Sequence, residues 1–175
     1  MEVSIYRRRG QFKVSALCVV VTLGLIVVGG ISPLRAGVDL SGCEDSSSQE
    51  VETVFDELLQ TVAEARVSTR TGGYEIRVNP FDSYFGWETL RWLYLRQCAH
   101  INLDHDLIAI RANQGSLRQA HDADCWAISW LTEREGLSIR EVRTIERDLE
   151  RLDSRDWERF LGPRRSTDLS RCLKK

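Results

Sequence analysis

Apolar residues recur at helical spacing through most of the chain after residue 48. The first stripe, from Val51 to Val62, has intervals of mostly three and four residues and predicts an amphipathic helix over about 49–66. A second stripe predicts a helix from Ser83 to about Asp104. Its apolar members, which include most of the aromatic mass of the expected core, are Trp87, Leu90, Leu93, Tyr94, Leu95 and Ile101.

Residues typical of helix ends mark the limits of three more helices. Ser116 follows a polar break and is a suitable N-cap for a helix that Gly136 ends. Ser138 and Glu141 have the spacing of a capping box, in which each side chain bonds the backbone of the other residue, so a further helix begins there. A last short helix is expected at Trp157–Leu161.

Strand-like alternation of apolar and polar residues occurs at Tyr74–Val78, and Asn79 with Pro80 stops it. This pattern predicts one short strand, either alone or as the partner in a hairpin. The fold class that follows is mainly α (α+β), a helical domain of about five helices with one short β element.

The first 36 residues have the pattern of an export signal. Three arginines, Arg7 to Arg9, precede 21 uncharged residues between Lys13 and Arg35, and Ala36 is a small residue at a suitable cleavage point. An uncleaved membrane anchor is an alternative, because about 20 apolar residues span a bilayer. A lipoprotein is a third, on the resemblance of Leu40–Cys43 to a lipid-attachment box. All three predict a bacterial chain that is periplasmic or secreted, with 37–48 as a linker and 49–175 as the domain.

Charge is distributed unevenly between these parts. The net charge of −2 is the sum of +4 in residues 1–36 (five basic, one acidic) and −6 in residues 37–175 (19 basic, 25 acidic). An acidic body without a basic stripe does not suit nucleic-acid binding. The partners we expect are therefore a protein or a peptide, and the membrane only through the N-terminal segment.

Four cysteines remain beyond the leader, and in an oxidising compartment they would form two disulfides. Three pairings are open from the sequence. We expect Cys98–Cys125, which would join two predicted helices, and Cys43–Cys172, which would tie together the two ends of the domain.

All three histidines fall within 22 residues, among several aspartates. Imidazole and carboxylate groups are ligands for zinc and similar ions. His100, His105, His121 and Asp124 are therefore candidate metal ligands, carried by two successive helices. Zinc is the cofactor to consider, although the expectation developed below is that none is bound.

Two segments carry a family resemblance. The run from Arg96 to His105 (Arg-Gln-Cys-Ala-His-Ile-Asn-Leu-Asp-His) and the run from Ala123 to Ala127 (Ala-Asp-Cys-Trp-Ala) resemble bacterial exported proteins related to zinc metallopeptidases. The strand followed by Asn79 and Pro80 is similar to the segment that precedes the zinc helix in such proteins. The resemblance covers about residues 70–135 and implies a metallopeptidase-like helix pair.

The chemistry of that family depends on a His-Glu-x-x-His helix, in which two histidines hold zinc and the glutamate activates water. Carried over residue by residue, the first ligand position is Arg96, the general-base position is Gln97 and the third-ligand position is Ala120. None of these side chains can do the family's chemistry. Only His100 and Asp124 match, as the second ligand and as the acid that orients the first.

These substitutions predict a contact that replaces the metal. If Asp124 still points toward position 96, its carboxylate should pair with Arg96 at about 3 Å, the length of a hydrogen bond. The leading functional interpretation is an exported, non-catalytic metallopeptidase-like protein with a binding or structural role in the cell envelope. One alternative is a metal-dependent hydrolase with a rearranged site of His100, His105 and His121. The other is a secreted helical interaction protein unrelated to peptidases.

Overall fold

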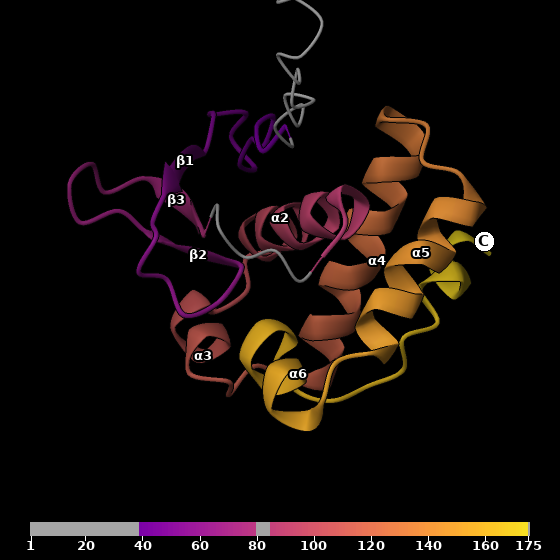
Figure 1. Cartoon of the computed structure of the whole chain (residues 1–175). Coiled ribbons are helices and arrows are strands. Elements are labelled where there is room, and N and C mark those ends of the chain that lie inside the picture. The colour runs from indigo at the N-terminus through magenta and orange to yellow at the C-terminus, as the bar shows by residue number, and fades with distance from the viewer. Residues whose placement is uncertain (1–38, 80–84, 175) are drawn as a thin grey trace, which may run out of the picture. The chain divides into compact units, whose positions relative to one another are not determined.

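The computed structural model describes residues 39–79 and 85–174. The described residues all belong to one compact unit, residues 38–175. Their elements, in chain order, are the strands β1 (Glu52–Phe55), β2 (Ala63–Val67) and β3 (Tyr74–Val78), the helices α2 (Trp87–Asn102), α3 (Leu107–Arg111), α4 (Leu117–Arg134), α5 (Ile139–Glu150) and α6 (Ser154–Leu161), and the 3-10 helix η1 (Leu169–Leu173) (Figure 1). The fold is mainly α with a small sheet, as predicted.

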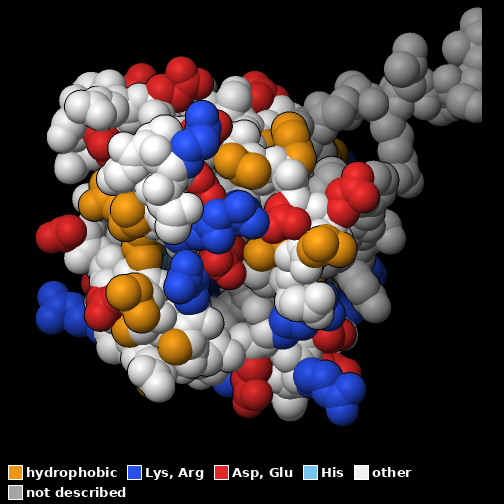
Figure 2. Space-filling model, turned by 90° about the vertical axis from the view of Figure 1, so that its left-hand side faces the viewer, with side chains coloured by type: hydrophobic (Ala, Val, Ile, Leu, Met, Phe, Trp, Pro, Cys, Tyr) orange, Lys and Arg blue, Asp and Glu red, His pale blue; other side chains and the backbone are white. Residues whose placement is uncertain are grey.

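The sheet has three strands in the order β1-β3-β2. β3, the one strand predicted, is its central member: it pairs parallel with β1 and antiparallel with β2. Figure 1 shows the sheet on one side of α2, with α4 and α5 on the other. The side of the molecule that carries the sheet has basic and acidic side chains interspersed (Figure 2). Ion pairs join Arg70 to Glu52 and Arg77 to Asp56.

The helix predicted over 49–66 is wrong, because β1 and β2 occupy this segment. Val51 and Val62 of the apparent stripe are buried, whereas Phe55 and Leu58 are exposed. Asp56 ends β1, since its carboxylate accepts the backbone N–H of Leu58 and forms a turn there. Pairing with β3 then satisfies the backbone of both segments, and this long-range contact outweighs a helix-like spacing.

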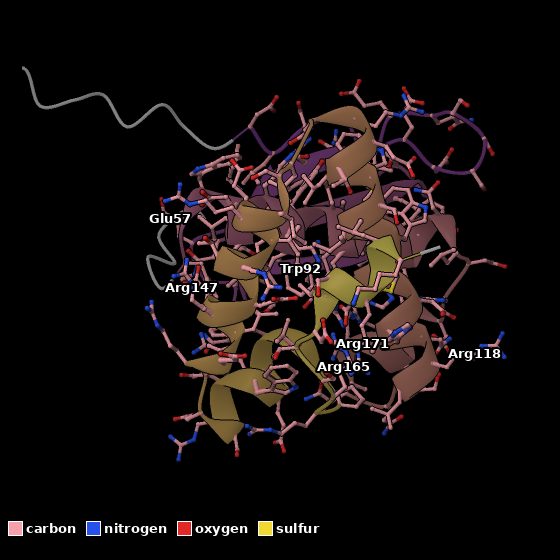
Figure 3. The ribbon with its side chains drawn as sticks, turned by 90° about the vertical axis from the view of Figure 1, so that its right-hand side faces the viewer. Glu57, Trp92, Arg118, Arg147, Arg165 and Arg171 are labelled. Carbon is pink, nitrogen blue, oxygen red and sulfur yellow. A yellow bond between two sulfur atoms is a disulfide. The ribbon has the colours of Figure 1, made fainter. Side chains whose placement is uncertain are left out.

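α2 is the central helix of the domain. It packs against β2, β3, α4 and α5, and nearly every residue from Thr89 to Ile101 is buried. In Figure 3, Trp92 lies in the interior while Arg118 and Arg147 lie at the periphery. A helix covered on both sides accounts for its weak segregation of polar and apolar faces, and its polar residues are buried together with the apolar ones.

Two predicted helix starts are confirmed, whereas α2 begins at Trp87 rather than at Ser83, and α6 begins at Ser154, three residues before the predicted Trp157. Ser116 and Ser138 are N-caps of α4 and α5, each in a capping box, with Gln119 and Glu141 as the respective partners. Gly136 follows the end of α4 at φ +71°, where a residue without Cβ is favoured. α3 was not predicted. It is only five residues long, too short for apolar positions to recur at helical spacing, and none of its residues is fully buried.

The N-terminal loop of the described domain is attached to α2. Arg91 donates a hydrogen bond to the carbonyl of Ser41, and Asn102 donates one to the carbonyl of Glu44. The signal peptide and anchor predictions concern residues 1–36, which lie outside the described residues. The Leu40–Cys43 segment of the lipoprotein alternative is described, and the Cys43 sulfur that would carry the lipid is bonded to Cys98 instead. Within 39–79 and 85–174, no helix is long and apolar enough to cross a membrane.

The four cysteines form two disulfides, but the predicted pairing is wrong. Cys43 bonds Cys98 and Cys125 bonds Cys172. The physical reason is that each end of the domain packs on a different helix: the N-terminal loop lies on α2, and η1 lies on α4. Both disulfides indicate an oxidising, extracytoplasmic environment.

Candidate functional site

A cleft of about 460 Å³ opens between the sheet and the C-terminal helices. One wall is the β1–β2 loop with the start of β2, and the other is formed by the ends of α3 and α6. α2 contributes Arg96 and Gln97, and α4 contributes Ala120. The three positions that the resemblance marks as replaced catalytic positions therefore line one cleft, although they come from two helices.

Arg96 and Asp124 form a buried ion pair between α2 and α4. The Arg96 Nε atom lies 2.8 Å from Asp124 Oδ1, and both side chains are about 5% exposed or less. This confirms the predicted contact. Arg96 also donates to the carbonyl of Leu161 at the end of α6, so one guanidinium joins three helices at the cleft.

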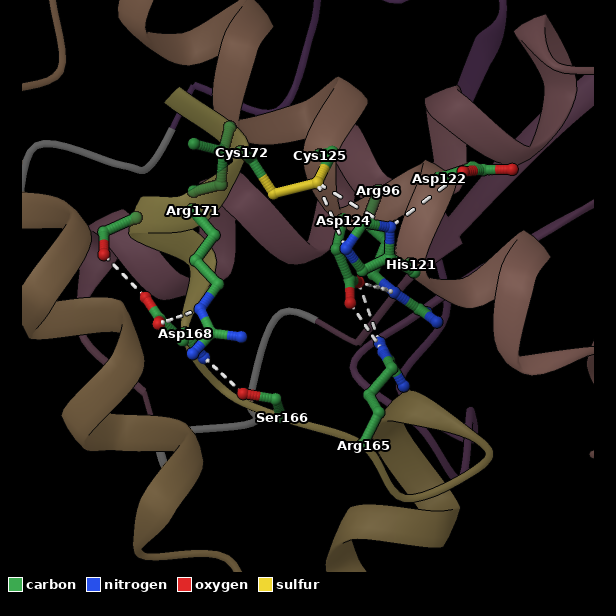
Figure 4. Close-up of a disulfide and its surroundings, with 12 residues drawn as sticks. Arg96, His121, Asp122, Asp124, Cys125, Arg165, Ser166, Asp168, Arg171 and Cys172 are labelled. Carbon is green, nitrogen blue, oxygen red and sulfur yellow. Dashed lines mark hydrogen bonds and ion pairs between the residues drawn. A yellow bond between two sulfur atoms is a disulfide. The ribbon is translucent and has the colours of Figure 1, made fainter. Parts of the chain in front are cut away.

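A second guanidinium shares the same carboxylate. Arg165 donates to both oxygens of Asp124, at 2.6 and 2.8 Å (Figure 4). Sequence reasoning missed this residue because it lies 41 positions from Asp124, beyond any helical spacing. Two guanidinium groups on one carboxylate leave the cluster with a net charge of +1.

Burial and this positive charge act on the neighbouring titratable groups. Burial lowers the pKa of Arg96, and the carboxylate of Asp124 opposes that effect. Burial and the charges of Arg96, His105 and Arg165 together lower the pKa of His100 to about 2, with burial the largest cause. His100 is therefore neutral over the whole physiological range.

His100 contacts His105 through their Nδ1 atoms, which are 2.8 Å apart. One of the two nitrogens must carry the hydrogen. The Nε2 atom of His100 is buried and has no hydrogen-bond partner among the described residues. Because an unpaired lone pair costs less than an unpaired N–H, the favoured arrangement has His100 Nδ1–H donating to His105.

Gln97 makes a structural contact with the sheet. Its side-chain oxygen accepts the backbone N–H of Ala65, at 3.2 Å. Ala65 belongs to β2, an edge strand, and the odd-numbered residues of β2 direct their backbone groups away from β3. Gln97 thereby satisfies a buried donor at the free edge of the sheet.

The four predicted metal ligands are not brought together. His100 pairs with His105, Asp124 is fully engaged by two arginines, and the exposed His121 lies beside the Cys125–Cys172 disulfide. A family-type zinc site also does not fit this chain, because Arg96 and Ala120 supply no ligand atom. Among residues 39–79 and 85–174, the group of three with ligand atoms close together is His121, Cys125 and Cys172.

That second cluster lines a separate groove of about 760 Å³. α4 forms one side, with Trp126 and Trp130, and the N-terminal loop and the end of α2 form the other. The groove is acidic, with Arg134 as its one arginine. Its acidic side chains are Glu44, Asp45, Asp122 and Glu133.

Comparison with known proteins adds no further constraint. No family model matches the chain, and neither the curated proteins nor the solved structures gave a match.

Proposed function

We propose that this chain is an exported, non-catalytic binding protein on a metallopeptidase-like helix pair, acting in the bacterial periplasm or after secretion. The observation that carries the proposal is the buried Arg96–Asp124 pair at the base of a cleft that Gln97 and Ala120 also line. In this interpretation an ion pair takes the place of the metal that would join the two helices.

The side chains at the base of the cleft support a non-catalytic role. A guanidinium cannot coordinate zinc, and the carboxamide of Gln97 cannot accept a proton from water. The single carboxylate of the cluster, Asp124, is bound by two arginines and is 4% exposed. Of these described side chains at the base of the cleft, none is free to act as a base.

The walls of the cleft support a peptide as the ligand. Ala63 and Glu64 of the edge strand β2 line one side, and an edge strand offers backbone groups to an extended chain. Charged side chains of both signs, Glu64 and Arg111 among them, lie at the rim, 3.8 Å apart. The disulfides and the N-terminal leader both favour an extracytoplasmic partner.

The test restores the missing ligands. We expect the full-length Arg96→His/Gln97→Glu/Ala120→Glu variant to bind one zinc ion per chain by calorimetry under oxidising conditions. The unchanged protein should bind none in the same buffer and should not cleave a mixture of casein peptides. The matched control, Arg96→His/Gln97→Glu with Ala120 retained, lacks the third ligand and should bind zinc at least tenfold more weakly.

Two outcomes would contradict the proposal. A triple variant that folds by circular dichroism but binds no zinc would favour the unrelated helical interaction protein. Peptide cleavage by the unchanged chain would favour the hydrolase. The hydrolase built on His100, His105 and His121 has less support, because the three histidines lie in two separate clusters.

A further inference from the structure

The Cys125–Cys172 disulfide lies beside a histidine with metal-ligand spacing. His121 and Cys125 are four residues apart on α4 and share a face, and η1 brings in Cys172 (Figure 4). The ligand atoms of the three residues lie within 4.8 Å of one another. A pair of ligands one helical turn apart plus a third from another element is a common construction for zinc.

The distances suit a tetrahedral ion. Cys125 Sγ lies 3.8 Å from His121 Nε2 and 3.9 Å from Nδ1. With Zn–S and Zn–N bonds of about 2.3 and 2.0 Å, a sulfur and a nitrogen ligand of one zinc ion are about 3.6 Å apart. The imidazole therefore lies at about ligand distance from the sulfur. Its two nitrogens are nearly equidistant from Sγ, so binding requires the disulfide to open and the ring to turn one nitrogen toward the ion.

The Cys125–Cys172 disulfide is more accessible to solvent than the Cys43–Cys98 disulfide. Cys43 and Cys98 are 0% and 1% exposed, although Cys98 also borders the acidic groove, whereas Cys125 and Cys172 are partly exposed in that groove. A reductant can reach the second pair first, because thiol–disulfide exchange requires access to a sulfur atom. The four carboxylates of the groove also favour the approach of a divalent cation.

We propose that reduction of Cys125–Cys172 creates a zinc site formed by His121, Cys125 and Cys172. A dithiol, such as that of a thiol–disulfide oxidoreductase, gives two electrons to the disulfide and becomes a disulfide itself, leaving two thiols. Zinc then binds both sulfurs as thiolates, and their two protons pass to solvent. Water completes the tetrahedron, and the metal replaces the covalent tie between α4 and η1.

The experiment uses the full-length protein and cobalt(II) as a spectroscopic substitute for zinc. Limited treatment with a phosphine reductant, followed by alkylation and mass spectrometry, should modify Cys125 and Cys172 before Cys43 and Cys98. The reduced, unalkylated protein should bind one cobalt ion per chain with a thiolate-to-metal charge-transfer band, which an equivalent of zinc removes. The oxidised protein should show no such band.

Variants assign the ligands. His121→Ala should weaken cobalt binding by the reduced protein at least tenfold, whereas His105→Ala, the matched control, should leave it unchanged. Cys125→Ser/Cys172→Ser should abolish the band and keep the helical circular dichroism signal. The proposal is overturned if the reduced, folded protein binds no cobalt, if His121→Ala binds as tightly as the unchanged chain, or if all four cysteines are alkylated together. None of these outcomes depends on the Arg96 cleft, so the two proposals fail separately.

Discussion

Asp124 is the residue on which the interior polar cluster depends. It is the single carboxylate between Arg96 and Arg165, and it also joins α4 to α2 and to the segment after α6. Two buried guanidinium groups without it would carry an uncompensated charge in a low-dielectric setting. Loss of either arginine leaves the other in place, so the three residues should not be energetically equivalent.

We therefore expect Asp124→Ala to lower the free energy of unfolding by about 3–5 kcal/mol, because it leaves two buried cations unpaired. Arg96→Met should cost about 1–2 kcal/mol, since Arg165 still pairs with Asp124. Urea unfolding followed by tryptophan fluorescence measures both. Arg118→Ala is the control, since its side chain is 91% exposed and the change should be within 0.5 kcal/mol. Equal losses for Asp124→Ala and Arg96→Met would contradict this account.

His100 should make the protein sensitive to acid. Its folded-state pKa is about 2, against 6.5 for a free histidine, so below pH 6.5 the unfolded chain binds a proton that the folded chain does not. Stability is then constant above about pH 6.5 and falls by about 1.4 kcal/mol per pH unit from there toward pH 2. Urea unfolding measured from pH 7.5 to 4.5 should show this slope.

The pH window separates the two contacting histidines from the carboxylates, because burial also lowers the pKa of His105, which therefore contributes below pH 6.5 as well. Glu75 also makes the protein less stable in acid. Burial raises the pKa of its carboxyl group, but hydrogen bonds from Ser68, Arg66 and Arg77 outweigh that effect and lower the pKa from 4.5 to about 2. That loss begins only below about pH 4.5. Between pH 6.5 and 4.5, His100→Leu should reduce the slope and the exposed His121→Ala should not. An unchanged slope in His100→Leu would exclude His100 as the cause.

At the scale of elements, most of the structure follows from local sequence. α4 and α5 begin at capping boxes, and β3 alternates between apolar and polar residues along its length. These signals act within a few residues, so the sequence predicts them well. β1 and β2 were not predictable in this way: β1 pairs with a strand about 20 residues away, and nothing in its own four residues specifies that partner.

The contact between Gln97 and β2 joins a helix to a strand through one hydrogen bond. Gln97→Leu removes the acceptor for the buried N–H of Ala65 and should cost about 1–3 kcal/mol. Gln97→Glu keeps an acceptor at this position and serves as the matched control. Hydrogen exchange followed by NMR should show faster exchange at the Ala65 amide in Gln97→Leu only. Unaltered protection of that amide would remove the structural role assigned to Gln97.

At the scale of the whole molecule, the two disulfides attach both ends of the domain to its central helices. Cys43–Cys98 closes a loop of 55 residues onto α2, and Cys125–Cys172 closes one of 47 residues onto α4. Loops of these lengths remove similar amounts of chain entropy from the unfolded state, about 4 kcal/mol each. The two pairs differ in burial, which decides how a substitution affects the folded state.

Replacing each cysteine pair by alanine separates the effect of chain entropy from the effect of burial. Both Cys125→Ala/Cys172→Ala and Cys43→Ala/Cys98→Ala should lose up to about 4 kcal/mol. The second should lose about 1–2 kcal/mol more, because its sulfur atoms are fully buried and their removal leaves a cavity. Guanidinium unfolding of the two variants measures the difference. A larger loss for the Cys125 and Cys172 pair would show that burial does not control the outcome.

The sequence by itself predicted the helices α2, α4 and α5, the strand β3 and the Arg96–Asp124 pair. Capping and helical periodicity act within one or two turns, so a single segment contains the information. Only the tertiary structure decided the sheet order, the disulfide pairing, the second guanidinium on Asp124 and the cluster of His121, Cys125 and Cys172. Each of these joins segments far apart in the chain, and the path of the backbone between them, rather than local preference, sets which side chains meet.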